Sequence, residues 1–149
     1  MQRLDLIRAT HPNDLEQCFA LRREVFVVEQ QVDEAEEYDE FETRSHHYLA
    51  RRNGQPVGTA RWRVTPEGKV KLERIAVRHE SRKQGIGAAL VRAMLADIPP
   101  GYTIYMHAQT HALPFYQLLG FVGEGELFWE AGIEHQRMVY QKPSPYRTP

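Results

Sequence analysis

The sequence predicts an α/β fold in which helices flank a sheet of about seven strands. Seven runs have the alternation or composition of strands, and segments with helical spacing separate several of them. The dipeptide Asn53-Gly54 lies between two of the strand-like runs and favours a tight hairpin turn. The predicted sheet therefore contains at least one antiparallel pair together with helical crossovers.

The N-terminal elements are a strand and a helix. Leu4 and Leu6 alternate with polar residues in the run LDLIRAT, which predicts the first strand. Thr10 and Pro12 mark the start of a helix whose apolar spacing continues to Phe26, interrupted by Arg22. The following run, EQQVDEAEEYDEFE, is expected to be an acidic loop or an irregular helix.

The central elements surround the hairpin dipeptide and a glycine-rich run. Strands are expected in HHYLARR, in QPVGTARWRV and in VKLERIAV. A helix is expected from Gly85 until the breaker Pro99-Pro100-Gly101, followed by the strand YTIYMHAQ. The short helix HALPFYQLLG has Pro114 near its start and Gly120 where a left-handed cap belongs. The runs FVGEGELF and EHQRMVYQ complete the strands.

Length and composition indicate one domain in a reducing compartment. The 149 residues are long enough to bury a core, and we expect one domain over 1–149, with a core of about 4–142 and a flexible tail at 143–149. A net charge of -1 provides no general basic field for nucleic acid. The single Cys18 cannot form an internal disulfide, and no signal or membrane-spanning run is evident. We therefore expect a cytoplasmic protein without membrane or nucleic-acid partners.

The run RKQGIG predicts a phosphate-binding loop. A strand leads into it and a helix leaves it, which places free backbone amides and the positive end of the helix dipole together. Arginine and lysine side chains add positive charge for a pyrophosphate. Neither the Walker pattern nor the dinucleotide fingerprint fits the run. The alternative is a glycine-rich helix start with surface cations that binds no ligand. The predicted binding residues are Arg82, Lys83, Gln84, Gly85, Ile86 and Gly87.

These residues carry a resemblance to a known family. The spacing Arg82-x-x-Gly85-x-Gly87 resembles the coenzyme A pyrophosphate loop of the GNAT superfamily of acyl-CoA N-acyltransferases. The run from Gln109 to Phe121 resembles the second motif of that superfamily, with Gln109 where asparagine is usual. The run LRREVFVVEQ is similar to the first helix of a bacterial small-molecule subgroup, and EAGIEHQRM resembles a segment of glyphosate-acetylating relatives. The resemblance implies a mixed, mostly antiparallel sheet that is splayed in the middle.

The resemblance also implies an activity and several site residues. It implies transfer of the acetyl group of acetyl-CoA to a primary amine in a direct ternary complex. The backbone of Ile75, Ala76 and Val77 would hold pantetheine and polarise the acetyl carbonyl, and Gln109 and Phe115 would lie beside the cofactor. Leu72 is out of phase with the residues that follow it, which a one-residue bulge or a misjudged strand end would explain. Tyr116 would be the general acid near the sulfur, although a core tyrosine is the alternative.

Two residues are candidates for the general base. His135 matches the catalytic histidine of the glyphosate-acetylating relatives, and imidazole titrates near neutrality. Glu73 lies two residues before Ile75 on the cofactor strand, where related enzymes often use a glutamate. We favour His135, because a carboxylate needs burial to raise its pKa. The alternatives are a half-exposed strand histidine and a salt bridge from Glu73 to Arg74 or Lys71.

The other charged residues do not identify the acceptor substrate. The acidic segment 32–42 could attract a cationic amine or be a solvated charge run, whereas Arg22, Arg23, Arg61 and Arg63 could anchor an anionic acceptor. The histidines lack a metal-ligand spacing, so no metal is expected. The alternatives to an acetyltransferase are a non-catalytic acyl-CoA binding module and an acyl-homoserine lactone synthase. A homodimer is consistent with the family.

Overall fold

Seven strands form one sheet in the computed structural model, which describes residues 3–141. The strand order is β1-β2-β3-β4-β5-β7-β6, and only the β4–β5 pair is parallel. This mixed, mostly antiparallel sheet confirms the predicted fold class. The strands are β1 (Leu4–Ala9), β2 (His46–Arg52), β3 (Gln55–Val64), β4 (Val70–Val77), β5 (Ile104–Gln109), β6 (Phe121–Glu130) and β7 (Ile133–Tyr140). The predicted tail at 143–149 lies outside the described residues, and one domain over 1–149 stays a prediction.

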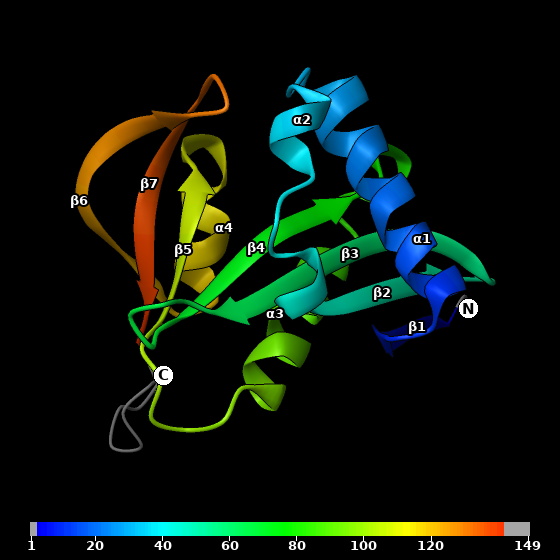
Figure 1. The fold of residues 1–149 in the computed structure, drawn as a ribbon, viewed down its shortest axis with the longest axis horizontal. Helices are drawn as coiled ribbons and strands as arrows, with labels where there is room; N and C mark the ends of the chain where they lie inside the picture. The colour runs from blue at the N-terminus through cyan, green and yellow to red at the C-terminus, as the bar shows by residue number, and fades with distance from the viewer. Residues whose placement is uncertain (1–2, 142–149) are drawn as a thin grey trace.

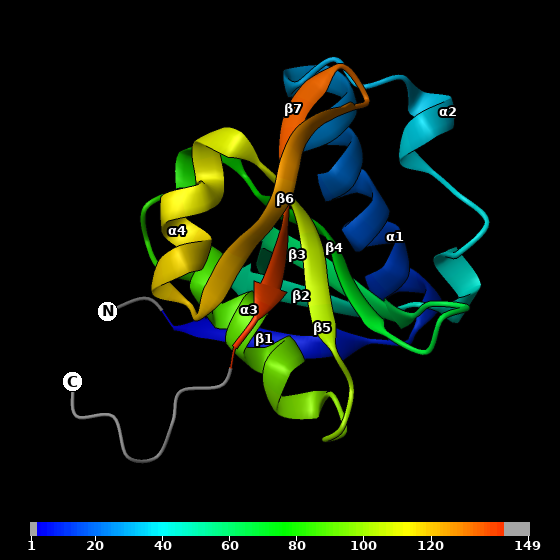
Figure 2. The ribbon, with the colours of Figure 1, turned by 90° about the vertical axis from the view of Figure 1, so that its left-hand side faces the viewer.

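Helices cover both faces of the sheet. Figures 1 and 2 show α1 and α2 on one face and α3 and α4 on the other. The α-helices are α1 (Pro12–Arg22), α2 (Glu34–Glu37), α3 (Ile86–Asp97) and α4 (Leu113–Leu118). The π-helix η1 (Arg23–Glu29) follows α1, and short 3₁₀ turns are η2 (Glu42–Arg44), η3 (His79–Ser81) and η4 (Thr110–Ala112). No helix within residues 3–141 combines the length and apolar composition that a membrane span requires.

The main core lies between the central strands and α3. Leu90 and Met94 of α3 are fully buried against Leu72 and Met106, which are directly paired across β4 and β5. Such side chains each contribute roughly 1.5–3 kcal/mol when removed from water. Gly58 of β3 allows the close approach of α3, since a Cβ there would meet the Ile86 Cγ2 atom at 2.8 Å. The core therefore fixes the helix that follows the predicted phosphate loop.

The sheet opens between β4 and β5. Their parallel pairing runs only from Val70 opposite Ile104 to Leu72 opposite Met106, and beyond it the two strands separate. On the other side of β4, Arg61 pairs with Glu73 and Thr59 with Ala76, so two β4 residues oppose the single Ala60. Arg74 at this bulge has φ 55°. The predicted bulge is confirmed, and it bends β4 away from β5.

The first helix changes character at Arg22. Sequence spacing predicts one continuous helix to Phe26, but from Arg23 the helix is wound as a π-helix. Arg22 is only 1% exposed and faces the interior. The apparent interruption of the apolar pattern is therefore a buried arginine whose partners come from another segment.

Candidate active site

A cavity of about 560 Å³ lies where β4 and β5 separate. It brings together residues that are distant in sequence, from η1, β4, β5, α4 and the β6–β7 hairpin. The predicted site residues that line it are Glu73, Ile75, Ala76, Val77, Arg82, Gln109, Tyr116 and His135. The predicted residues outside its lining are Lys83, Gln84, Gly85, Ile86, Gly87 and Phe115.

The predicted phosphate loop joins β4 to α3. Lys83 and Gly85 have φ 64° and 81°, and Gly85 is the N-cap of α3 without a side-chain cap bond. The first amides of α3 therefore lack the capping partner that many helices have. The Ile86 side chain is buried, so only its backbone is available to a ligand. A Cβ on Gly87 would meet the Phe115 ring at 3.3 Å, which explains a glycine there.

The side chains of this loop contact other parts of the protein. The Arg82 Nε donates to the Val77 carbonyl at 3.0 Å, and its two terminal nitrogens bind the Glu29 carboxylate at 2.5 and 2.7 Å. This ion pair lowers the pKa of Glu29, chiefly through the hydrogen bond from Arg82. Gln84 accepts a hydrogen bond from Arg52. A pyrophosphate at this loop would therefore compete with Glu29 for Arg82.

A pair of amides connects η1 to β5 across the same cleft. The Gln109 Nε2 donates to the Gln30 Oε1 at 2.9 Å, and the Gln30 Nε2 donates back at 3.3 Å. The His111 Nε2 also contacts the Gln109 Oε1 at 2.7 Å. The unusual glutamine of the second motif is therefore held by neighbours, and Gln30 is a lining residue that sequence reasoning missed.

Tyr116 lies in α4 and lines the cavity. Its ring packs edge-on against Phe115 and Phe121, with centroids 5.0 and 6.1 Å away. Burial raises the pKa of the Tyr116 phenol above its ordinary value, so the hydroxyl keeps its proton at neutral pH. No hydrogen-bond partner for this hydroxyl is present among residues 3–141, although Tyr116 lines the cavity. The residue is both a core aromatic and a free donor.

His135 lies near the start of β7 and is 8% exposed. Its Nδ1 is 2.7 Å from the Ile133 carbonyl oxygen, and its ring stacks on Phe128 at 5.9 Å between centroids. A carbonyl can only accept, so the hydrogen bond places the proton of neutral imidazole on Nδ1. The Nε2 lone pair is then left without a protein partner in the described part of the chain. This arrangement is able to accept a proton from a ligand.

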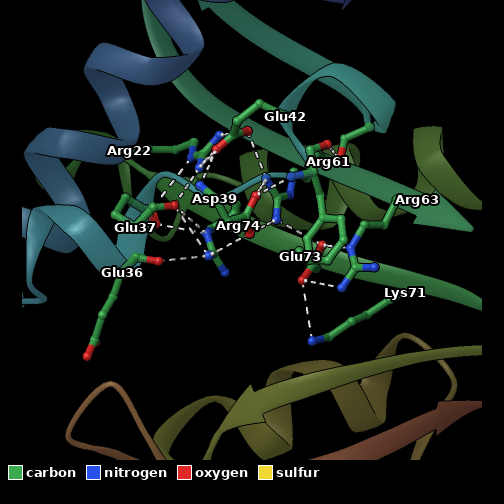
Figure 3. Close-up of polar contacts among 12 residues, drawn as sticks. Arg22, Glu36, Glu37, Asp39, Glu42, Arg61, Arg63, Lys71, Glu73 and Arg74 are labelled. Atoms are coloured by element: carbon green, nitrogen blue, oxygen red, sulfur yellow. Dashed lines mark hydrogen bonds and ion pairs between the residues drawn. The ribbon is translucent and has the colours of Figure 1, made fainter. Parts of the chain in front are cut away.

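Glu73 has the opposite environment. It is 8% exposed and binds Arg61 at 3.0 Å, Arg63 at 2.7 Å and Lys71 at 3.3 Å (Figure 3). Burial acts to raise the pKa of this carboxyl, but the charges of Arg61, Arg63 and Lys71 outweigh burial and hold the pKa below its ordinary value. Three cations therefore compensate a buried carboxylate whose affinity for a proton is reduced.

The acidic segment belongs to the same ion-pair network. Arg22 binds Glu42 at 2.7 Å, Arg61 binds both Asp39 and Glu42, and Arg74 binds Glu37 at 2.9 Å. The solvated charge run that sequence reasoning allowed is therefore wrong for these carboxylates. Buried and half-buried arginines neutralise them, and the network ties the segment to α1, β3 and β4 (Figure 3). The same contacts occupy arginines that were candidates to bind an anionic acceptor.

Three further lining residues were not predicted. Lys71 lies on β4, His107 on β5 and Glu130 at the end of β6, and the His107 Nδ1 is 2.9 Å from the Glu130 Oε2. The period of two in strands could have indicated the first two, because Lys71 shares a face with Glu73 and His107 shares one with Gln109. Only the fold brings Glu130 to His107. Within residues 3–141, no group of three metal-ligating side chains could hold a metal ion.

The splayed sheet, the bulged strand and the cavity between them define the acyltransferase class of α/β domains. The acetyltransferase (GNAT) domain family matches residues 10–142, nearly the whole chain. The chain therefore belongs to the GNAT acetyltransferase family. Nothing in these similarities distinguishes the glyphosate-acetylating subgroup.

Individual relatives agree with this assignment. The chain is similar to the uncharacterized N-acetyltransferase YjcF of Bacillus subtilis, 38% identical over 135 residues that cover 88% of this chain and 95% of the relative. A solved acyl-CoA N-acyltransferase from Pseudomonas aeruginosa has a TM-score of 0.80 at 30% identity, covering 95% of this chain and 100% of the other. Escherichia coli ElaA has a TM-score of 0.81 at 26% identity, with the same coverage.

Proposed function

We propose that the protein transfers the acetyl group of acetyl-CoA to a primary amine of a small acceptor within a ternary complex. The observation that carries this proposal is the cavity at the β4–β5 separation, which brings the backbone of β4, Tyr116 and His135 together. Cys18 supports direct transfer rather than an acyl-enzyme. It is fully buried in α1 and absent from the cavity lining, and burial raises the pKa of its thiol.

The bulged part of β4 would hold the thioester. Residues Ile75–Val77 line the cavity beyond the point where β5 stops pairing with β4, so their groups that face away from β3 have no strand partner. Backbone groups in this position are able to bind pantetheine and to donate to a carbonyl oxygen that gains charge. Arg82, which lines the cavity, and the first amides of α3, which follow it in the chain, would bind the pyrophosphate.

His135 would be the general base. It lines the cavity, its Nε2 has no protein partner in the described part of the chain, and a neutral imidazole is able to take a proton from an attacking amine. Glu73 is the poorer base, because Arg61, Arg63 and Lys71 stabilise its charged form. In our proposal Glu73 holds the network together.

Tyr116 would assist the departing thiolate. Its raised phenol pKa lies above the ordinary thiol value of about 8.5, so complete proton transfer to sulfur is unfavourable. A hydrogen bond from the hydroxyl to the developing thiolate is the favourable role. Replacing Tyr116 by phenylalanine should therefore slow turnover about 10- to 100-fold without abolishing it, because a hydrogen bond to a charged group contributes roughly 1.5–3 kcal/mol.

The test is release of free thiol from acetyl-CoA with polyamines, amino sugars, amino acids and aminophosphonates as acceptors. The expected result is turnover with at least one amine, and a large loss of turnover in His135→Gln while calorimetric acetyl-CoA binding is unchanged. Binding of the cofactor without turnover of any amine would instead support the acyl-CoA binding module. A lactone product from S-adenosylmethionine would support the acyl-homoserine lactone synthase.

A further inference from the structure

We propose that the acceptor carries a second cationic group, separate from the amine that reacts, and that Glu130 and Glu36 bind it. The acceptor class is then a short aliphatic diamine or polyamine. This inference rests on the proposed function, since it concerns the acceptor end of the same cavity. Both carboxylates line that cavity, one from the end of β6 and the other from α2.

The cations around the cavity are already engaged by the protein. Lys71 binds Glu73 at 3.3 Å, and Arg74 binds Glu37 at 2.9 Å and Asp39 at 3.3 Å. Taking Lys71 or Arg74 for an acceptor carboxylate or phosphonate would separate an ion pair whose other member is at least partly buried, which is costly.

The arginines proposed as anchors of an anionic acceptor are also engaged. Arg61 and Arg63 both bind Glu73, and Arg22 binds Glu42 at 2.7 Å. Arg23 is exposed, is paired with Glu34 at 3.5 Å, and does not line the cavity. The alternative of an anionic acceptor has therefore lost its candidate anchors.

Glu130 presents a fixed negative charge. Its Oε2 is held 2.9 Å from the His107 Nδ1, and no partner for its second oxygen is present among the described residues. The hydrogen bond from His107 lowers the pKa of Glu130 to about 2, so this carboxylate is ionised at neutral pH. Glu130 therefore places an ionised carboxylate, with one unpartnered oxygen, at the cavity wall.

Glu36 is the second carboxylate. Its backbone carbonyl accepts from Arg74 at 3.4 Å, which fixes the residue, whereas its carboxylate has no ion-pair partner within residues 3–141. Figure 3 shows its side chain extending away from the ion-pair network, and the residue lines the cavity. The ion-pair network contains five cations, Arg22, Arg61, Arg63, Lys71 and Arg74, and four carboxylates, Glu37, Asp39, Glu42 and Glu73. The lysine and arginine cations therefore exceed the carboxylates by one. When Glu36 and Glu130 are added, the carboxylates exceed these cations by one.

An independent observation points to a polar ligand at this end. His135 is 8% exposed, and its Nε2 has no protein partner in the described part of the chain although the ring lines the cavity. A ring nitrogen that lines a cavity and has no protein partner is able to hydrogen-bond a polar ligand there. The reacting amine would meet His135, and a second ammonium a few bonds away would meet the carboxylates.

The experiment compares two acceptors of equal length, 1,4-diaminobutane and 4-amino-1-butanol, which differ only in the second charged group. The measured quantity is the ratio of their kcat/KM values. Wild type should prefer the diamine about 10- to 100-fold, which corresponds to roughly 1.5–3 kcal/mol for hydrogen bonds to a charged group. Glu130→Gln should reduce this preference about tenfold, and Glu36→Gln should reduce it less because Glu36 is exposed.

Matched controls exclude a general charge effect. Glu126→Gln removes an exposed carboxylate from β6, and Glu40→Gln removes one from the acidic segment, and neither residue lines the cavity. Both controls should leave the ratio unchanged within a factor of about two. The inference is overturned if wild type does not prefer the diamine, if amino acids or aminophosphonates react faster, or if Glu130→Gln slows both acceptors equally.

A binding measurement separates this inference from the proposed function. Calorimetric titration of 1,4-diaminobutane into the protein saturated with coenzyme A does not need turnover. If no amine is acetylated, the proposed function fails. The inference about the acceptor class then still stands if the diamine binds and Glu130→Gln weakens that binding about tenfold, and it fails if the diamine does not bind.

Discussion

Replacing Glu73 by glutamine should destabilise the protein by about 2–3 kcal/mol at pH 7. Removing one member of a buried ion pair costs roughly 3–5 kcal/mol, because the remaining charge is uncompensated. The expected cost lies at or just below the bottom of that range, since Arg61 keeps Asp39 and Glu42 as partners and Lys71 is partly accessible to water. For a domain of this size the loss corresponds to a fall in Tm of about 5–10 °C.

The pH dependence gives the sign of the effect. The pKa of Glu73 is lower in the folded protein than its ordinary value, so the folded state binds fewer protons than the unfolded state near that value. The stability from Glu73 is fully present above the ordinary glutamate pKa of about 4.3 and is lost as the pH falls further. Wild type and Glu73→Gln should therefore converge in stability when the pH is lowered toward the acid range.

The assay is urea unfolding of both proteins at pH 7 and at several lower pH values. The pH dependence of kcat/KM is measured on the same two proteins. If His135 is the general base, the fall of kcat/KM at low pH should persist in Glu73→Gln. The reasoning is refuted if Glu73→Gln unfolds like wild type at pH 7. If kcat/KM of this variant no longer falls at low pH and its stability is unchanged, Glu73 is instead the general base.

Three further predictions follow from individual contacts. His135→Gln should lower kcat/KM about 10²- to 10⁴-fold, the usual contribution of a general base, and equal urea unfolding of the two proteins would exclude a folding defect. Glu29→Gln should strengthen acetyl-CoA binding about two- to fivefold in calorimetry, because Arg82 is then free of its exposed ion pair; weaker binding would contradict the assigned competition. Gly58→Ala should lower the free energy of unfolding by about 1–3 kcal/mol, because its Cβ would lie 2.8 Å from the Ile86 Cγ2 atom, and an unchanged Tm would show that α3 shifts freely.

Much of the fold is determined by local sequence patterns. Asn53 and Gly54 both have positive φ at the β2–β3 turn, and Gly120 has φ 101° after α4, as their residue types predict. The phase change at Leu72 indicated the bulge in β4, which lies just after the point where β4 and β5 stop pairing. These features depend on backbone preferences and on periodicity, which act over a few residues and are therefore visible in the sequence.

The surroundings of each site residue could not be predicted in the same way. Sequence reasoning named Glu73 as a possible base, but its role depends on Arg61 and Arg63 from β3, which the antiparallel pairing places beside it. It also allowed the acidic segment to be a solvated charge run, whereas Arg22 and Arg61 bind its carboxylates. Burial and charge pairing depend on all elements that surround a group, and no local pattern records them.

The sequence alone therefore determined the order of elements, the glycine-rich loop before α3 and the residue types available for chemistry. Only the tertiary structure decided which of them meet: β4 and β5 separate after three paired positions, and His135, Tyr116 and the bulge of β4 then line one cavity. The physical reason is that turns and strand phase depend on near neighbours in the chain. A cavity and the ionisation of its lining depend on groups that are distant in the chain and close in space.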